Sequence, residues 1–196
     1  MGRPREFDQP AALAAAMDQF WRRGYEATSV RDLAGAMSIT GASLYNAFGD
    51  KRSLFRDCLE AYIDAYARRR IAELDACEDP IRGIRAFFDD LVEASLNDRR
   101  GCLLINSAME VAPWDTELAA LIEDCLREIE DGFCRALNRL SAAGPRRASG
   151  SERSTARLML SAVMALRVLA RAGGHEERLR SIARSAVALA EGHRSL

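Results

Sequence analysis

The sequence has no long hydrophobic run, no cysteine pair of the C-x-x-C type and only two histidines. Its apolar stretches fall short of the roughly 20 residues with which a helix spans a bilayer, so we expect neither a transmembrane helix nor a membrane partner. The first ten residues, MGRPREFDQP, have no apolar core behind their charges and do not resemble a secretory signal. The chain has five cysteines, an odd number, and no export signal. We therefore expect reduced thiols and a cytoplasmic protein.

Motifs of catalysis and metal binding are also missing. Nothing near His175 or His193 has the spacing of a metal site, and there is no G-x-S-x-G elbow, P-loop or G-x-G-x-x-G. Glu110 and Asp115, beside Trp114, could form a catalytic carboxylate pair, but a helix end with its cap explains them better. We therefore expect no enzyme, no metal and no cofactor. A helical enzyme or a protein-binding adaptor without DNA binding is the alternative of another class.

The composition is that of a globular protein. The 196 residues are 48% hydrophobic and 29% charged, and 28 basic against 29 acidic side chains leave a formal net charge of −1. A chain of this length buries roughly 70% of its unfolded surface. Residues 1–57 carry only eight basic and seven acidic side chains. Any binding to nucleic acid must therefore depend on a few placed contacts and not on a broad positive field.

Apolar residues recur at helical spacing almost throughout, and no stretch alternates in the manner of a strand. The pattern predicts an all-α protein of about nine helices, short in the N-terminal third and long in the remainder. The first helix begins near Pro10 and ends at Gly24, and Ser29 with Asp32 forms a capping box for the second. The longer helices are expected at about 50–77, 80–97, 115–140, 154–172 and 175–193, with a short apolar segment at 102–111 and a loop at 141–151.

The stretch from Thr28 to Lys51, TSVRDLAGAMSITGASLYNAFGDK, predicts a helix, a tight turn, a short second helix and the capped start of another. This order is typical of a helix-turn-helix, whose second helix enters the DNA major groove. Two helices that merely pack together would give the same pattern. The core-facing positions of the second helix are Leu44, Ala47 and Phe48, and its outward positions are Gly41, Ala42, Ser43 and Asn46.

At these residues the sequence resembles the TetR/AcrR family of bacterial transcriptional regulators. The resemblance begins at FWRRGY, residues 20–25, continues through TSVRDLA, residues 28–34, and is strongest at SLYNAFGDKRSLF, residues 43–55. It implies a dimeric repressor that binds double-stranded DNA. Its small-molecule ligand, bound in the C-terminal domain, would reorient the two DNA-binding domains. We expect residues 1–50 to form the helix-turn-helix domain, extended by the start of the fourth helix, and 51–196 to form the regulatory and dimerisation domain.

Eight residues are predicted to contact DNA: Thr28, Ser29, Thr40, Ala42, Ser43, Tyr45, Asn46 and Lys51. The first three stand at helix starts, where hydroxyls and backbone N–H groups suit phosphates. Ser43 and Asn46 are candidates for base edges, because an amide can pair bidentately with adenine. A phosphate contact by Tyr45 is what the family's matching tyrosine implies, and Lys51 supplies a cation for another phosphate.

Simpler interpretations of the same residues remain. Ser29 can serve only as a helix cap, and the ring of Tyr45 can pack in the domain core. Arg3 and Arg5 lie on an N-terminal arm that could reach a minor groove or belong to a solvated tail.

The helices between about residues 80 and 140 are expected to enclose a cavity for an apolar effector. Its candidate lining residues, several of which can equally be plain core packing, are Phe88, Leu91, Cys102, Leu104, Met109 and Phe133. Cys102 also gives an alternative function, a redox- or electrophile-sensing regulator, because a helix N-terminus favours a thiolate. The simpler interpretation of Cys102 is a small buried hydrophobe.

The last two helices carry many alanines on wide apolar faces. Small residues on such faces suit close packing against the same helices of a second copy, in a four-helix bundle across a two-fold axis. The candidate interface residues are Ala162, Leu166, Leu169, Ile182, Ala186 and Ala190. Such a homodimer would present its two recognition helices roughly 34–36 Å apart, to a near-palindromic operator. The alternative is packing on helices of the same chain.

Overall fold

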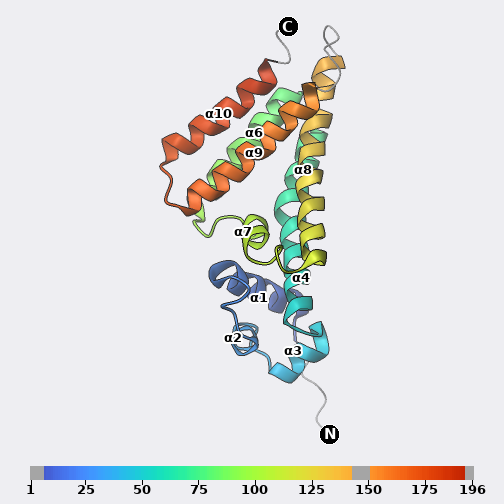
Figure 1. The fold of residues 1–196 in the computed structure, drawn as a ribbon, viewed down its shortest axis with the longest axis vertical. Helices are drawn as coiled ribbons and strands as arrows, with labels where there is room; N and C mark the ends of the chain where they lie inside the picture. Colours follow the sequence, from blue (N-terminus) through green and yellow to red (C-terminus); the bar gives the residue numbers. More distant parts are fainter. Residues whose placement is uncertain (1–6, 143–150, 193–196) are drawn as a thin grey trace.

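The computed structural model describes residues 7–142 and 151–192, and its regular structure over these ranges is helical (Figure 1). The elements are α1 (Gln9–Arg23), α2 (Val30–Ala36), α3 (Gly41–Phe48), α4 (Lys51–Tyr62), the π-helical segment η1 (Ile63–Arg68), α5 (Arg69–Ala76), α6 (Pro80–Asn97), α7 (Leu103–Glu110), α8 (Thr116–Ala142), α9 (Ser151–Arg171) and α10 (Glu176–Glu191). Because α4, η1 and α5 form one continuous rod, the described residues contain nine helical units, and the predicted all-α class is confirmed. Arg3, Arg5, His193 and most of the predicted loop at 141–151 lie outside the described residues.

Figure 1 shows α1, α2 and α3 gathered at one end of the molecule, with the bundle of α6, α8, α9 and α10 at the other. The rod that begins with α4 packs on α1 and continues into the bundle, where α5 packs on α6 and α8. Helix α7 lies between the two ends, against α4, α8 and α9. None of the helices over the described ranges combines the length and apolar character that crossing a bilayer requires.

Local hydrogen bonds explain where the N-terminal helices begin and end. Ser29 and Asp32 form the predicted capping box of α2, and the side chains of Thr40 and Asp50 cap α3 and α4. Gly24, with φ of 88°, ends α1 at a backbone conformation that glycine adopts without strain. The short turn between α2 and α3 places Ser38 at φ of 55°, in the left-handed region of backbone conformation.

An aromatic cluster joins α1 to the rod. The ring centroids of Phe20 and Phe55 are 4.9 Å apart, and those of Trp21 and Tyr62 are also 4.9 Å apart, both in edge-on geometry. Tyr66, in η1, completes the cluster at 5.6 Å from Trp21. All but Tyr66 are nearly fully buried, so the core runs from the N-terminal helices into the bundle without a gap.

One polar contact across the two ends of the molecule is the ion pair of Arg52 on α4 with Asp115. The guanidinium donates to both carboxylate oxygens, at 2.5 and 2.9 Å, and also to Glu117 at 2.7 Å. Asp115 additionally accepts from the backbone N–H groups of Glu117 and Leu118, so it caps α8 as the sequence predicted. Arg52, followed by these backbone donors, lowers the pKa of Asp115 to about 2.

A second contact is made by Glu110, at the end of α7. Its two carboxylate oxygens accept from the backbone N–H groups of Tyr25, at 3.1 Å, and Glu26, at 2.9 Å. The carboxylate lies so close to Gly24 that a Cβ there would meet its oxygens at 2.7 and 2.8 Å. Glu110 and Asp115 therefore each have separate structural partners and do not act as the carboxylate pair that the sequence left open.

Removing the Asp115 side chain should destabilise the protein. We expect Asp115→Ala to lower the free energy of unfolding by about 1–2 kcal/mol, because it removes a helix cap and an ion pair. Asp115→Asn should cost less, because asparagine also caps helices. Since the folded pKa of Asp115 is depressed, its contribution is present above pH 4 and should vanish as pH falls towards 2. Urea unfolding of both variants across this pH range measures it, and a pH-independent difference would contradict it.

Removing the Glu110 side chain should loosen the segment between α1 and α2. We expect Glu110→Ala to speed hydrogen exchange of the Tyr25 and Glu26 amides by about tenfold, because each loses a charged acceptor. Glu110→Gln keeps one acceptor oxygen and should have an intermediate effect. Amides inside α6, such as that of Leu91, are the internal control and should exchange as in the parent. Unchanged exchange at Tyr25 and Glu26 in the alanine variant would show that the contact has no energetic weight.

Candidate nucleic-acid interface and junction cavity

Helix α3 presents one side to the core and the other to solvent. Leu44 is fully buried, and Phe48 is partly buried beside the ring of Phe7, as the sequence predicted for core-facing positions. On the opposite side, Tyr45 is 52% exposed and Asn46 is also exposed. The exposed side therefore carries a phenol and an amide, which suit phosphate and base edges respectively.

Four further predicted contacts lie around this side. Ala42 and Thr40 are exposed, and Ser43, partly buried, shares a hydrogen bond of 2.9 Å between its hydroxyl and that of Thr40. Lys51, the first residue of α4, places its ammonium 4.2 Å from the ring centre of Tyr25. The structure thus brings these residues together at the start of α3 and α4, and their contact with DNA stays a prediction.

Of the two predicted contacts before α2, one is wrong. Thr28 is fully buried, and its hydroxyl donates to the carbonyl oxygen of Gly24 at 2.6 Å, so its side chain has no access to a phosphate. Its place is structural, because it secures the backbone just after the end of α1. Ser29 is exposed, but its hydroxyl also donates to the carboxylate of Asp32 at 2.6 Å. The hydroxyl and the backbone N–H of Ser29 both donate to Asp32 and lower its pKa, so a negative charge stays beside this candidate contact.

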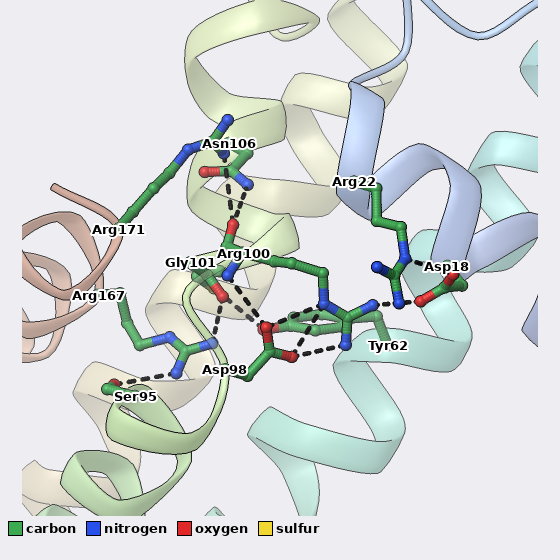
Figure 2. A network of polar contacts seen from close by, with 11 residues as sticks. Asp18, Arg22, Tyr62, Ser95, Asp98, Arg100, Gly101, Asn106, Arg167 and Arg171 are labelled. Carbon is green, nitrogen blue, oxygen red and sulfur yellow. Dashed lines mark hydrogen bonds and ion pairs between the residues drawn. The ribbon is translucent and has the colours of Figure 1, made fainter. Parts of the chain in front are cut away.

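Arg100, in the loop between α6 and α7, is the centre of a network that reaches α1 (Figure 2). Its guanidinium lies 3.9 Å from the ring centre of Trp21 and forms an ion pair with Asp18 on α1. It also donates to both oxygens of Asp98, at 2.5 to 3.0 Å. Arg100 lowers the pKa of Asp98, so the pair stays charged while it ties α1 to the bundle.

Beside this network, a cavity of about 510 Å³ lies where the end of α1 meets α7 and α9. Its walls include the aromatic side chains of Phe20, Trp21, Tyr25 and Phe55. Its charged side chains are Arg23, Glu110, Arg167 and Arg171. Among the described residues, no group of three or more His, Cys, Asp or Glu side chains is arranged to hold a metal ion.

The predicted pocket residues divide between this cavity and the bundle core. Cys102 and Met109 line the cavity, whereas Leu91 and Leu104 are buried in the hydrophobic core. Phe88 and Phe133 are also fully buried, with their rings stacked at 5.7 Å. For the four core residues the packing interpretation fits what the structure shows, and a role in ligand binding stays a prediction for all six.

Sequence reasoning missed Trp21 and Arg167 as cavity residues, although a signal for the second was present. Val163, Leu166, Arg167 and Ala170 are spaced i, i+3, i+4 and i+7 along α9, and all four are buried. A charged residue on the inward stripe of a helix indicates a buried polar site. Trp21 gave no such signal, because a tryptophan on an apolar stripe is ordinary core.

Cys102 stands just before α7, partly buried. The hydroxyl of Tyr62 donates to its sulfur at 3.4 Å. By contrast, Cys58 and Cys125 are deeply buried, and burial raises the pKa of the Cys125 thiol to about 12, which makes it inert. Cys102 is thus the cysteine that lines the cavity, and its role as a redox or electrophile sensor stays a prediction.

The predicted dimer residues fall into two groups. Leu166, Ala186 and Ala190 are at most 2% exposed because helices of their own chain cover them, so the prediction that they meet a partner is wrong. Ala162, Leu169 and Ile182 are partly exposed. Large exposed apolar side chains accompany them on the same helices, with Leu158 at 56% and Leu189 at 42%.

Comparison with known proteins agrees with this architecture. Residues 12–58 match the model of the family described as bacterial regulatory proteins, tetR family. An HTH-type transcriptional regulator of Bacillus subtilis, YezE, is 36% identical over 146 residues, which cover 74% of this chain and 75% of that protein. The HTH-type transcriptional repressor ComR of Escherichia coli is 37% identical over 60% of this chain and 58% of its own.

A solved structure extends the similarity over nearly the whole chain. A cysteine-substituted form of the TetR family regulator CifR, in complex with 26-bp double-strand operator DNA, superimposes with a TM-score of 0.85 at 32% identity. The superposition covers 95% of this chain and 98% of that one. The resemblance seen at its motif residues is thus confirmed. The chain belongs to the tetR family of bacterial regulatory proteins and is a helix-turn-helix transcriptional regulator and not an enzyme.

Proposed function

We propose that the protein is a homodimeric repressor that binds a near-palindromic operator through α3 and releases it when a small molecule occupies the regulatory half. The observation that carries this proposal is the exposed side of α3, where a phenol and an amide stand on a short helix capped at its start and backed by a buried leucine. A rigid helix of this kind fits the major groove. Acting on DNA in this way places the protein in the cytoplasm.

In this proposal, residues 1–50 read the operator and residues 51–196 regulate it. Tyr45 and Lys51 hold phosphates and fix the register on the duplex, while Asn46 reads a base edge. Release requires that the regulatory half changes the position of α3. Three contacts can transmit such a change, namely those of Arg52 with Asp115, Glu110 with the backbone after α1, and Arg100 with Asp18. A ligand that favours another arrangement of these contacts shifts the population away from the DNA-binding form.

The homodimer is supported by an apolar stripe that the chain itself leaves partly uncovered. Leu158, Ala162, Ala165 and Leu169 lie on α9 at spacings of four, three and four, so they share one side of the helix. Ile182 and Leu189 add to it on α10. Two copies of this surface, called here the α9–α10 face, can pack in an isologous four-helix arrangement.

The DNA contacts can be separated by three substitutions. The parent protein first selects its preferred duplex from a randomised library, and fluorescence anisotropy then gives affinities. Tyr45→Phe and Lys51→Ala should weaken binding about equally on all sequences, and Lys51→Ala should lower the salt slope by about one. Asn46→Ala should instead relax preference at particular base pairs, by about 1–3 kcal/mol.

Arg82→Gln, at the exposed start of α6, is the control and should bind like the parent. If the three α3 and α4 variants also bound like the parent, α3 would not be the recognition helix. Failure of the parent to select any duplex would overturn the proposed function itself.

The dimer can be tested on the exposed side chains of the α9–α10 face. Combined Leu158→Glu and Leu189→Glu should convert the protein to a monomer of 21.6 kDa in light scattering and abolish operator binding, because one half-site alone binds weakly. Ala120→Glu places the same charge on an exposed position of α8 and should leave the dimer intact. A parent protein of monomeric mass at micromolar concentration would contradict the proposal.

A further inference from the structure

Two arginines of the junction cavity have no carboxylate partner among the described residues. Arg167 is 6% exposed, and its guanidinium donates to the hydroxyl of Ser95 at 3.0 Å and to the carbonyl oxygen of Gly101. Arg171, one turn later on α9, donates to the carbonyl oxygen of Arg100 at 3.4 Å. Figure 2 shows both side chains reaching from α9 towards the loop that holds Asp98 and Gly101. All three acceptors are neutral, so they position the charges without balancing them.

The carboxylates nearest to these arginines already have other partners. Arg100 occupies both oxygens of Asp98, which acts on Arg167 only through space. Glu110, the one acidic residue in the cavity wall, is held by two backbone N–H groups. Arg23, the third arginine of the wall, pairs with Asp32 at 3.5 Å. A buried guanidinium that no carboxylate contacts directly is costly, and an anion in the cavity would offset part of that cost.

Most of the remaining wall is apolar or aromatic, and Asn106 and Ser107 are its polar members. Phe20, Trp21, Tyr25, Phe55 and Ile105 contribute to it. Trp21 is 4% exposed, so it offers the cavity part of its ring and not its buried indole nitrogen. A volume of about 510 Å³ fits a small organic molecule.

We propose that this cavity binds a small organic carboxylate, with the carboxylate group against Arg167 and Arg171 and the apolar body against Trp21. The arginines select a negatively charged ligand, and the aromatic wall adds apolar contact that favours organic acids over inorganic anions. The site lies at the junction of α1, α7 and α9 and not within the Phe88 and Phe133 core of the bundle.

A consequence for regulation rests on the proposed function. A carboxylate in the cavity shares it with Glu110, and two like charges in one partly buried space repel. Occupancy therefore weakens the hold of Glu110 on the Tyr25 and Glu26 amides and frees the segment that leads into α2. The ligand would then shift the helix-turn-helix without contacting α3.

The chain offers a reporter inside the cavity. Its two tryptophans are Trp21, in the wall, and Trp114, which is 88% exposed. In a Trp114→Phe background, Trp21 is the remaining tryptophan, so the change in tryptophan fluorescence reports ligand occupancy of the cavity. The probes are cyclohexanecarboxylate and 3-phenylpropionate, each compared with its neutral amide of nearly the same shape. We expect a saturable fluorescence change with at least one carboxylate, at an affinity about tenfold or more above that of its amide.

Arg171→Gln, made in the same background, tests the assignment of the charge. It should lower the affinity for the carboxylate by about tenfold and leave that for the amide unchanged, because only the carboxylate uses the guanidinium charge. Arg82→Gln removes one positive charge at the far end of α6 and should leave both affinities unchanged. Equal thermal unfolding of the variants shows that both are folded.

The inference is overturned if neither carboxylate gives a saturable change, if carboxylate and amide bind equally, or if Arg171→Gln and Arg82→Gln have the same effect. Operator binding is measured separately on the same preparations. A carboxylate preference that depends on Arg171 supports the site whether or not the protein binds DNA. Loss of that preference in a protein that still binds its operator overturns the site and leaves the proposed function standing.

Discussion

The carboxylate of Glu110 joins α7 to the backbone between α1 and α2 and so constrains the position of the N-terminal helices. Gly24 makes the contact possible, because it turns the backbone at φ of 88° and offers no Cβ where the carboxylate lies. The amides of Tyr25 and Glu26 then bind Glu110, and Thr28 closes the segment by donating to the Gly24 carbonyl. The start of α2 follows directly, so a displacement of Glu110 would also displace the start of α2.

The other polar contacts described between the two ends of the molecule come from the same stretch of chain. Arg100 precedes α7 and pairs with Asp18, while Asp115 follows α7 and pairs with Arg52. Helix α7 is thus attached to the N-terminal helices before it, at its end and after it. Packed cores have few alternative arrangements, so a short helix held in this way moves as a unit or not at all. The cavity lies against this helix, which gives a ligand direct access to the element that connects the two ends.

Local features of the fold could be predicted from the sequence, and the contacts across the junction could not. The capping box of Ser29, the end of α1 at Gly24 and the cap at Asp115 each depend on residues within a few positions, so the pattern alone indicates them. The contact of Glu110 with Tyr25 joins residues 85 positions apart, and no local pattern encodes it. Thr28 shows the limit of local reasoning, because a threonine at a helix start suits a phosphate equally well until its burial is known.

Arg167 differs from these cases, because the sequence alone shows a charged residue on the inward stripe of its helix. A search for apolar stripes passes over a charge at an inward position, yet that charge is the exception worth explaining. Ser95 and the Gly101 carbonyl fix the direction of the guanidinium, but no carboxylate contacts it directly. Replacing buried charges with hydrophobic residues of similar volume is often neutral or stabilising. An arginine here is therefore better explained by what it binds than by what it stabilises, and the same reasoning applies to any helix whose inward stripe contains an unpaired charge beside a cavity.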